Sequence, residues 1–258
     1  YQTRYQVDLF PLQPLGISAP VAPFVVLPGE PNHLRRHPGH PGQEGGAGQR
    51  TPPGVAHFLE HVLFETASGN ASALFSTRGA ASNAFTDYGS TAFFFSAPDS
   101  WEENLRLLLG FVLRPPFPAD KVEKERGIIL QEVRMYRDSP GSRLSENLHQ
   151  ALLSRHPARL DIAGTEASVQ AISRADLAAC HAAFYRPSNL CLVAAGDFRM
   201  KELLSVVRDE VPSQRLPKPS HRLPAEPARP ARGKISKQME VSQPQLLMGF
   251  KDPAPAKR

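Results

Sequence analysis

The chain has 258 residues, of which 41% are hydrophobic, 21% charged and 8% aromatic. This composition is typical of globular proteins and excludes the disordered and fibrous classes. No stretch approaches the roughly 20 apolar residues that a membrane-spanning helix needs, so we expect neither an integral membrane protein nor a membrane partner. Two cysteines, Cys180 and Cys191, are too few for a disulfide scaffold, which favours a reducing compartment.

The net charge is basic, because 30 Lys and Arg residues outnumber 25 Asp and Glu residues, giving +5 and a pI near 9.4. Many of the basic residues lie in one Pro-rich stretch, residues 215–232, which is typical of a solvated linker. A basic nucleic-acid-binding protein is an alternative function. No zinc-finger spacing, aromatic RNA-binding pattern or basic helix accompanies the charge, so we expect no nucleic-acid partner.

Residues 1–50 show little structural pattern. Residues 28–54 are rich in Pro, Gly, His and Arg and follow neither the period of a strand nor that of a helix, which indicates a long loop. No basic segment is followed by an apolar core, so no signal peptide is expected. We therefore expect a poorly structured or divergent N-terminal segment over residues 1–50.

A regular pattern begins at residue 51 and continues to residue 211. Apolar residues at helical spacing predict helices over residues 55–65, 70–78, 101–113, 119–136, 144–153, 174–184 and 201–211. Aromatic and Thr residues over 84–97 predict a strand pair or a bulged strand, and the apolar run 190–195 predicts a short buried strand. This mixture favours an α+β or mixed α/β domain over residues 51–211.

The C-terminal part divides into two further segments. Residues 212–234 contain the Pro-rich basic stretch and are predicted to be a linker. After the linker, the apolar run Gln245–Phe250 resembles the first strand of another domain. We expect residues 235–258 to be the start of a second domain, truncated at Arg258.

One predicted helix carries the candidate catalytic chemistry, in the sequence His57-Phe-Leu-Glu60-His61. Helical residues i and i+4 lie about 40° apart around the axis, so both imidazoles project from one face and suit a single Zn²⁺. Glu60 lies beside them, placed to take a proton from a water molecule that the metal activates. Apolar neighbours indicate a buried helix, in which unpaired His and Glu are costly and a shared metal would satisfy them.

A third zinc ligand must come from elsewhere, and the predicted helix 119–136 offers Glu125 and Glu132. Seven residues make about two helical turns, so both carboxylates point the same way, roughly 10 Å apart along the axis. One can ligate the metal while the other orients a ligating histidine. A solvated face of a charge-rich helix would explain the same two residues.

These motifs together resemble the insulinase/pitrilysin family of zinc peptidases, the inverzincins, whose inverted zinc motif is His-x-x-Glu-His. The resemblance rests on GVAHFLEH (54–61), on GAASNAFT (79–86), which is similar to the family's G-x-x-x-N-A-x-T, and on VEKERGIILQEVRMYRDSP (122–140), which resembles its second motif helix. Later landmarks lie at 163–165 and 184–197. The resemblance covers about residues 54–211 and is closest to bacterial two-domain members of the YmfH type, which implies a cytoplasmic location in a bacterium.

Carried over by position, the resemblance implies one Zn²⁺ per chain. The implied zinc ligands are His57, His61 and Glu132. Glu60 would be the general base, and Glu125 the second catalytic-site carboxylate, close to the metal without ligating it. The resemblance therefore assigns the two glutamates that the spacing left open.

The resemblance also implies a fold and a mode of action. The expected fold is α+β, with helices packed on a mixed, mostly antiparallel sheet, and the strand beginning near Asn83 and Ala84 would pair with an extended peptide substrate. Family members enclose short or unfolded peptides between two homologous halves. We therefore expect a zinc metalloendopeptidase whose chamber is closed by a second homologous half or a partner subunit. A non-catalytic family member or partner subunit is the alternative function. The sequence departs from the family in one respect, because residues 1–50 lack the strand-pair pattern with which family members begin.

Overall fold

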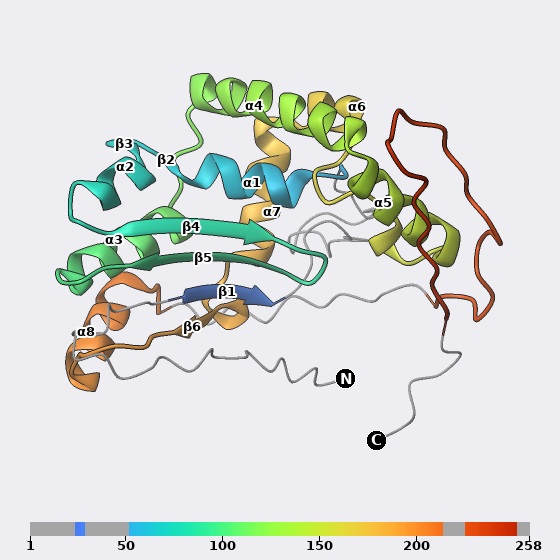
Figure 1. The fold of residues 1–258 in the computed structure, drawn as a ribbon. Helices are drawn as coiled ribbons and strands as arrows, with labels where there is room; N and C mark the ends of the chain where they lie inside the picture. Colours follow the sequence, from blue (N-terminus) through green and yellow to red (C-terminus); the bar gives the residue numbers. More distant parts are fainter. Residues whose placement is uncertain (1–23, 29–51, 214–224, 252–258) are drawn as a thin grey trace, which may run out of the picture.

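The computed structural model describes residues 24–28, 52–213 and 225–251 (Figure 1). Its main sheet has four strands in the order β4-β5-β1-β6, and each neighbouring pair is antiparallel. The strands are β1 (Phe24–Pro28), β4 (Ala81–Thr86), β5 (Ser90–Ser96) and β6 (Cys191–Val193). A separate pair is formed by β2 (Glu65–Thr66) and β3 (Gly69–Asn70). The expected α+β fold with an antiparallel sheet is confirmed.

The helices are α1 (Val55–Leu63), α2 (Ala71–Ser76), α3 (Trp101–Leu113), α4 (Ala119–Asp138), α5 (Pro140–Leu152), α6 (Glu166–Ala171), α7 (Arg174–Phe184) and α8 (Met200–Glu210). Each predicted helix forms with small shifts in its bounds, and the described residues contain one helix, α6, that was not predicted. Two 3₁₀ turns lie at Pro157–Arg159 and Pro187–Asn189. Figure 1 shows α1 between α4 and the β4–β5 hairpin, which makes α1 the central layer of the domain.

The core lies on the sheet face that carries Phe93 and Phe95, both fully buried. Phe95 stacks on Phe75 of α2, and Phe93 meets Phe111 of α3 edge to face. Strand residues two apart share a face, so Thr91 and its cross-strand partner Thr86 point toward the same side, where α1 packs. The hairpin thereby turns Thr86 toward the helix with the His-x-x-Glu-His motif.

Two glycines bring the start of α1 against the loop before α6. Gly54 and Gly164 both have positive φ, of +92° and +79°. A β-carbon on Gly54 would lie 2.6 Å from the carbonyl oxygen of Ala163, and one on Gly164 would lie 2.6 Å from that of Pro53. The two backbones touch at this point, which only glycine permits.

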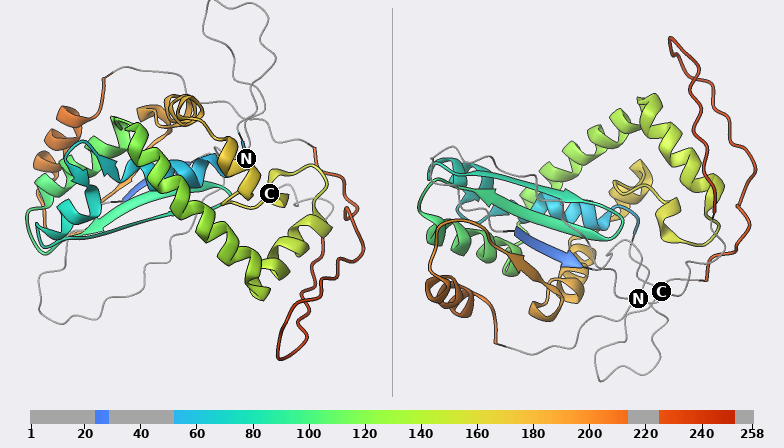
Figure 2. Two further views of the ribbon diagram at one scale, coloured as in Figure 1. Left: turned by 90° about the horizontal axis from the view of Figure 1, so that it is seen from above. Right: turned by 60° about the horizontal axis from the view of Figure 1, so that its bottom comes forward.

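Residues 24–28 correct the expectation for the N-terminal segment. They form β1, which lies inside the sheet between β5 and β6, so the prediction of little structure is wrong for these residues (Figure 2). A five-residue apolar run, FVVLP, carried the signal, but Pro-rich neighbours obscured it. The rest of residues 1–50 lies outside the described residues.

Strand β6 forms where it was predicted but is not buried. Cys191 is exposed, and Val193 is 47% exposed. Among the described strands β6 pairs with β1 alone, so it lies at an edge of the sheet. An apolar run of this length does not distinguish a central strand from an edge strand.

Residues 225–251 contain neither helix nor strand and run beside α5 (Figure 2). The backbone N–H of Arg232 donates to the carbonyl of Ala151, and Glu226 pairs with Lys251 at 2.8 Å. The strand expected over residues 245–250 is absent, and Leu246 and Phe250 are more than 80% exposed. Residues 214–224 of the predicted linker lie outside the described part of the chain. No helix in the described residues is long and apolar enough to cross a membrane.

Candidate metal centre and active site

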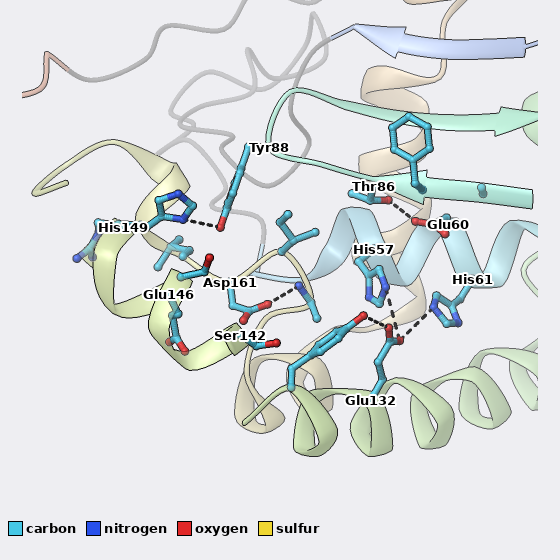
Figure 3. Close-up of a pocket in the computed structure, with 18 residues that line it drawn as sticks. His57, Glu60, His61, Thr86, Tyr88, Glu132, Ser142, Glu146, His149 and Asp161 are labelled. Atoms are coloured by element: carbon cyan, nitrogen blue, oxygen red, sulfur yellow. Dashed lines mark hydrogen bonds and ion pairs between the residues drawn. The ribbon is translucent and has the colours of Figure 1, made fainter. Parts of the chain in front are cut away.

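Helices α1 and α4 bring three potential metal ligands together. His57 and His61 stand one turn apart on α1, and Glu132 reaches toward them from α4 (Figure 3). The Oε2 atom of Glu132 lies 3.6 Å from Nε2 of His57 and 3.5 Å from Nε2 of His61. Each residue offers one ligand atom, and these atoms all lie within 4.8 Å of one another.

This cluster fits a zinc ion by chemistry and by spacing. Two imidazole nitrogens and one carboxylate oxygen are a donor set of catalytic zinc sites, in which a fourth position stays open. Ligand atoms about 2.1 Å from a tetrahedral zinc stand about 3.4 Å apart, close to the 3.6 and 3.5 Å between Glu132 Oε2 and the two imidazole nitrogens. The buried Nδ1 atom of His57 has no hydrogen-bond partner in the described residues, so this imidazole faces the cluster through Nε2, which lies beside Glu132.

The electrostatics of the cluster suit a cation. Burial and the neighbouring His61 lower the pKa of His57 to about 4, which keeps this imidazole neutral, as a metal ligand must be. Burial opposes the charged form of His61, but hydrogen bonds to Glu125 and Glu132 outweigh it and raise its pKa to about 9. The hydrogen bond with His61 lowers the pKa of Glu132 to about 2. A proton on His61 thus supplies positive charge where a metal would supply it.

Glu60 faces the same space from α1 (Figure 3). The hydroxyl of Thr86 donates a hydrogen bond of 2.5 Å to Oε2 of Glu60, which ties this carboxylate to strand β4. Burial raises the pKa of Glu60, and the Thr86 bond opposes part of that rise. A carboxylate with a raised pKa is a better proton acceptor near neutral pH.

Glu125 stands on the other side of His61. Its side chain is 8% exposed, and Oε2 lies 3.2 Å from Nδ1 of His61. A histidine that donates from Nδ1 presents Nε2, which here faces Glu132. The two glutamates therefore occupy different positions: Glu132 beside both Nε2 atoms, and Glu125 behind one imidazole.

A cavity of about 480 Å³ opens in front of these residues (Figure 3). The cluster and Glu60 form one end, β4 forms one wall, and α5 with the loop before α6 forms the opposite wall. Beyond the four motif residues, the lining comprises Ala84, Phe85, Thr86, Tyr88, Tyr136, Ser142, Ser145, Glu146, His149, Arg159, Leu160, Asp161, Ile162 and Ala163. The cavity therefore leaves open space directly beside the cluster and Glu60.

The structure separates the two residues predicted to bind substrate. Ala84 lines the cavity, and β4 is an edge strand of the described sheet. Asn83 is exposed and does not line the cavity, although Phe85, on the same face of the strand, does. Its Oδ1 accepts the backbone N–H of Ala84 at 2.8 Å, so this amide is not engaged with β5.

Sequence reasoning missed several residues of the site. Tyr136 donates a hydrogen bond of 2.6 Å to Oε1 of Glu132, and this bond raises the pKa of Tyr136 to about 12. Its spacing of four residues from Glu132 on one helix was an available signal. His149 lines the cavity, and its Nδ1 lies 3.1 Å from the hydroxyl of Tyr88. The two residues are distant in sequence, so no local pattern could have predicted their contact.

The fold and this cluster resemble those of the inverted-motif peptidases, and comparison with known families supports the resemblance. Residues 47–166 match the insulinase domain of peptidase family M16, and residues 171–257 match the peptidase M16 inactive domain. The chain belongs to peptidase family M16, the insulinase family. The predicted boundaries at residues 211 and 234 stay predictions.

Relatives in this family carry the name zinc protease. The chain is 39% identical over 209 residues to the "uncharacterized zinc protease YmfH" of Bacillus subtilis, covering 80% of this chain and 49% of the relative. It is 34% identical over 170 residues to the "uncharacterized zinc protease ML0855" of Mycobacterium leprae, covering 64% and 38%. The chain thus spans about half or less of the length of these relatives.

Solved structures share the fold. A protein of Alicyclobacillus acidocaldarius described as an M16-like peptidase superposes with a TM-score of 0.73 at 34% identity, covering 83% of this chain and 50% of that one. The periplasmic protease PqqL of Escherichia coli superposes with a TM-score of 0.66 at 23% identity, covering 81% and 23%. Both matched proteins extend well beyond the matched region.

Proposed function

We propose that this chain is the metal-binding half of a zinc metalloendopeptidase that hydrolyses short or unfolded peptides. One Zn²⁺ would be held by His57, His61 and Glu132. The observation that carries the proposal is the position of Glu132 Oε2, which lies within 3.6 Å of both Nε2 atoms although it comes from another helix. The zinc protease names of the relatives support the same chemistry.

The chain's own residues would divide the work of hydrolysis. The chemistry that a bound zinc would supply is a lowered pKa of a water molecule, toward about 7, and polarisation of the scissile carbonyl. Glu60 takes a proton from the attacking water and delivers it to the leaving amine. Thr86 holds one oxygen of Glu60, which leaves the other free to accept that proton. Tyr136 holds Oε1 of Glu132 and leaves Oε2 facing the imidazoles.

Strand β4 would bind the substrate as an added strand. Its edge is free in the described sheet, and Ala84, Phe85 and Thr86 line the cavity beside Glu60. Backbone hydrogen bonds to an edge strand give affinity with little sequence demand, which suits a peptidase that acts on unfolded chains. A second half, in the same polypeptide or from a partner subunit, would close the cavity, since the relatives are about twice as long.

The first experiment is elemental analysis of the purified chain beside a His57→Ala variant. The proposal expects about one zinc per wild-type chain and little in the variant. Zinc at equal levels in both proteins, or in neither, would contradict the assigned site. Peptide hydrolysis is then measured with and without a chelator, in the chain alone and mixed with the remaining half of a relative. Zinc binding without chelator-sensitive hydrolysis in either sample would favour a non-catalytic family member.

A further inference from the structure

A row of alternating charges runs from the metal cluster to Glu65, just beyond the C-terminal end of α1. His61 contacts Oε2 of Glu125 through Nδ1 at 3.2 Å. The ammonium of Lys124 lies 3.3 Å from the other oxygen, Oε1, of the same carboxylate. That ammonium also lies 2.8 Å from Oε1 of Glu65. Lys124 thus joins two carboxylates, one of which touches a candidate zinc ligand.

Glu65 is a fixed anchor for this lysine. Its side chain is 1% exposed, in strand β2 directly after the motif helix. Nδ2 of Asn70 donates to Glu65 at 3.1 Å, and Lys121 lies 3.5 Å from its second oxygen. Burial opposes the ionisation of Glu65, but the hydrogen bonds from Lys124 and Asn70 prevail and lower its pKa. A buried carboxylate held by three partners has little freedom to rotate.

Glu125, by contrast, has few restraints of its own. In the described part of the chain its carboxylate contacts His61 through one oxygen and Lys124 through the other. A carboxylate held at one oxygen alone can turn about its terminal torsion, which is broad and two-fold. Contact at both oxygens fixes its plane, and with it the direction from which His61 is held.

We propose that Lys124, anchored by Glu65, is a positioning residue for the zinc site. It holds Oε1 of Glu125 so that Oε2 accepts the Nδ1 proton of His61 and Nε2 stays directed at Glu132. The inference rests on the proposed zinc function. It assigns a role in metal binding to two residues outside the His-x-x-Glu-His motif that touch no candidate ligand themselves.

Lys121 is a matched control on the same helix. It lies one turn before Lys124 and approaches Glu65 as well, yet it does not contact Glu125. Removing either lysine takes one positive charge from the same neighbourhood. Only removal of Lys124 frees the carboxylate behind His61.

The test compares zinc affinities of the full chain by competition with a chromogenic chelator at fixed pH and ionic strength. Lys124→Met is expected to weaken zinc binding about 10-fold, the lower end of the effect of removing a partner behind a metal ligand. Glu65→Gln should weaken it in the same direction, Lys124→Arg should restore most of it, and Lys121→Met should stay within about two-fold of wild type. Thermal unfolding of each variant establishes that it is folded, as expected because Lys124 is half exposed.

A second readout addresses the histidine directly. In the zinc-loaded wild type, the Nδ1 proton of His61 should exchange slowly with solvent and give a sharp signal in proton–nitrogen-15 correlation spectra of the imidazole. Lys124→Met should broaden this resonance by solvent exchange, whereas Lys121→Met should not. Zinc affinity of Lys124→Met within two-fold of wild type, or an equal loss in Lys121→Met, would overturn the inference and leave the zinc site standing. A wild-type chain that binds no zinc would overturn the proposed function and the inference together.

Discussion

The contact between Gly54 and Gly164 leads to a prediction about the assembly of the site. Gly164→Ala would place a β-carbon 2.6 Å from the Pro53 carbonyl oxygen, where ordinary contact begins at 3.4 Å, at a residue with φ of +79°. The left-handed backbone costs an alanine about 1–2 kcal/mol. Separating the two backbones adds about 1–3 kcal/mol, the usual cost of overpacking. The expected loss of unfolding free energy is therefore about 2–5 kcal/mol.

Gly79→Ala is the matched comparison, because Gly79 has φ of +70° and nothing within 4 Å of the added carbon. It should lose only the backbone cost of about 1–2 kcal/mol. Urea unfolding followed by circular dichroism measures both variants. Equal losses would refute the reasoning, since they would mean that the approach of the two backbones contributes nothing. Gly164→Ala should also lower zinc affinity, because the moved loop borders the start of α1.

Three further predictions concern the cluster itself. Glu60→Gln should abolish peptide hydrolysis by the completed enzyme and leave zinc content at the wild-type level; hydrolysis that survives would remove Glu60 from its role as base. Tyr136→Phe should weaken zinc binding by up to about 10-fold, because Oε1 of Glu132 loses its hydrogen-bond donor. Titration against a chelator measures this affinity, and an unchanged value would show that the hydrogen bond does not contribute to zinc binding. Zinc affinity should rise with pH up to about 9 and then level off, because zinc must displace the proton that His61, with its pKa of about 9, carries below that value. Because the pKa of His57 is about 4, this imidazole is already neutral above pH 6 and adds nothing to the rise there, and isothermal titration at several pH values tests both statements.

The two motif helices were predictable from sequence because their signals are local. A five-residue motif fixed the face of α1, and seven-residue spacing put Glu125 and Glu132 on one side of α4. The spacing did not say which carboxylate lies at the imidazoles, because that depends on where α4 crosses α1. The crossing is set by packing between segments about 65 residues apart, which no helical pattern records.

Features that depend on distant partners escaped prediction for the same reason. Strand β1 is short and has Pro-rich neighbours, and its partners β5 and β6 come much later in the chain. Thr86 was part of a recognised motif, yet its bond to Glu60 exists only because β4 lies under α1. Asn83 was expected to bind substrate as part of strand β4, which stays a prediction, but no strand pattern indicated that its side chain would accept the Ala84 amide.

The hydrogen bond between Asn83 and the Ala84 amide has a consequence for β4, an edge strand of the described sheet. Exposed strand edges invite pairing with any extended chain, and proteins commonly blunt them to avoid aggregation. Here Asn83 already satisfies the Ala84 amide, so an incoming carbonyl would replace one hydrogen bond with another and gain little from the exchange. At Ala84, therefore, backbone pairing adds little, and the affinity proposed for β4 must come from its other positions and from side chains that enter the cavity. Extended chains whose side chains do not enter the cavity should therefore bind to β4 more weakly than chains whose side chains do.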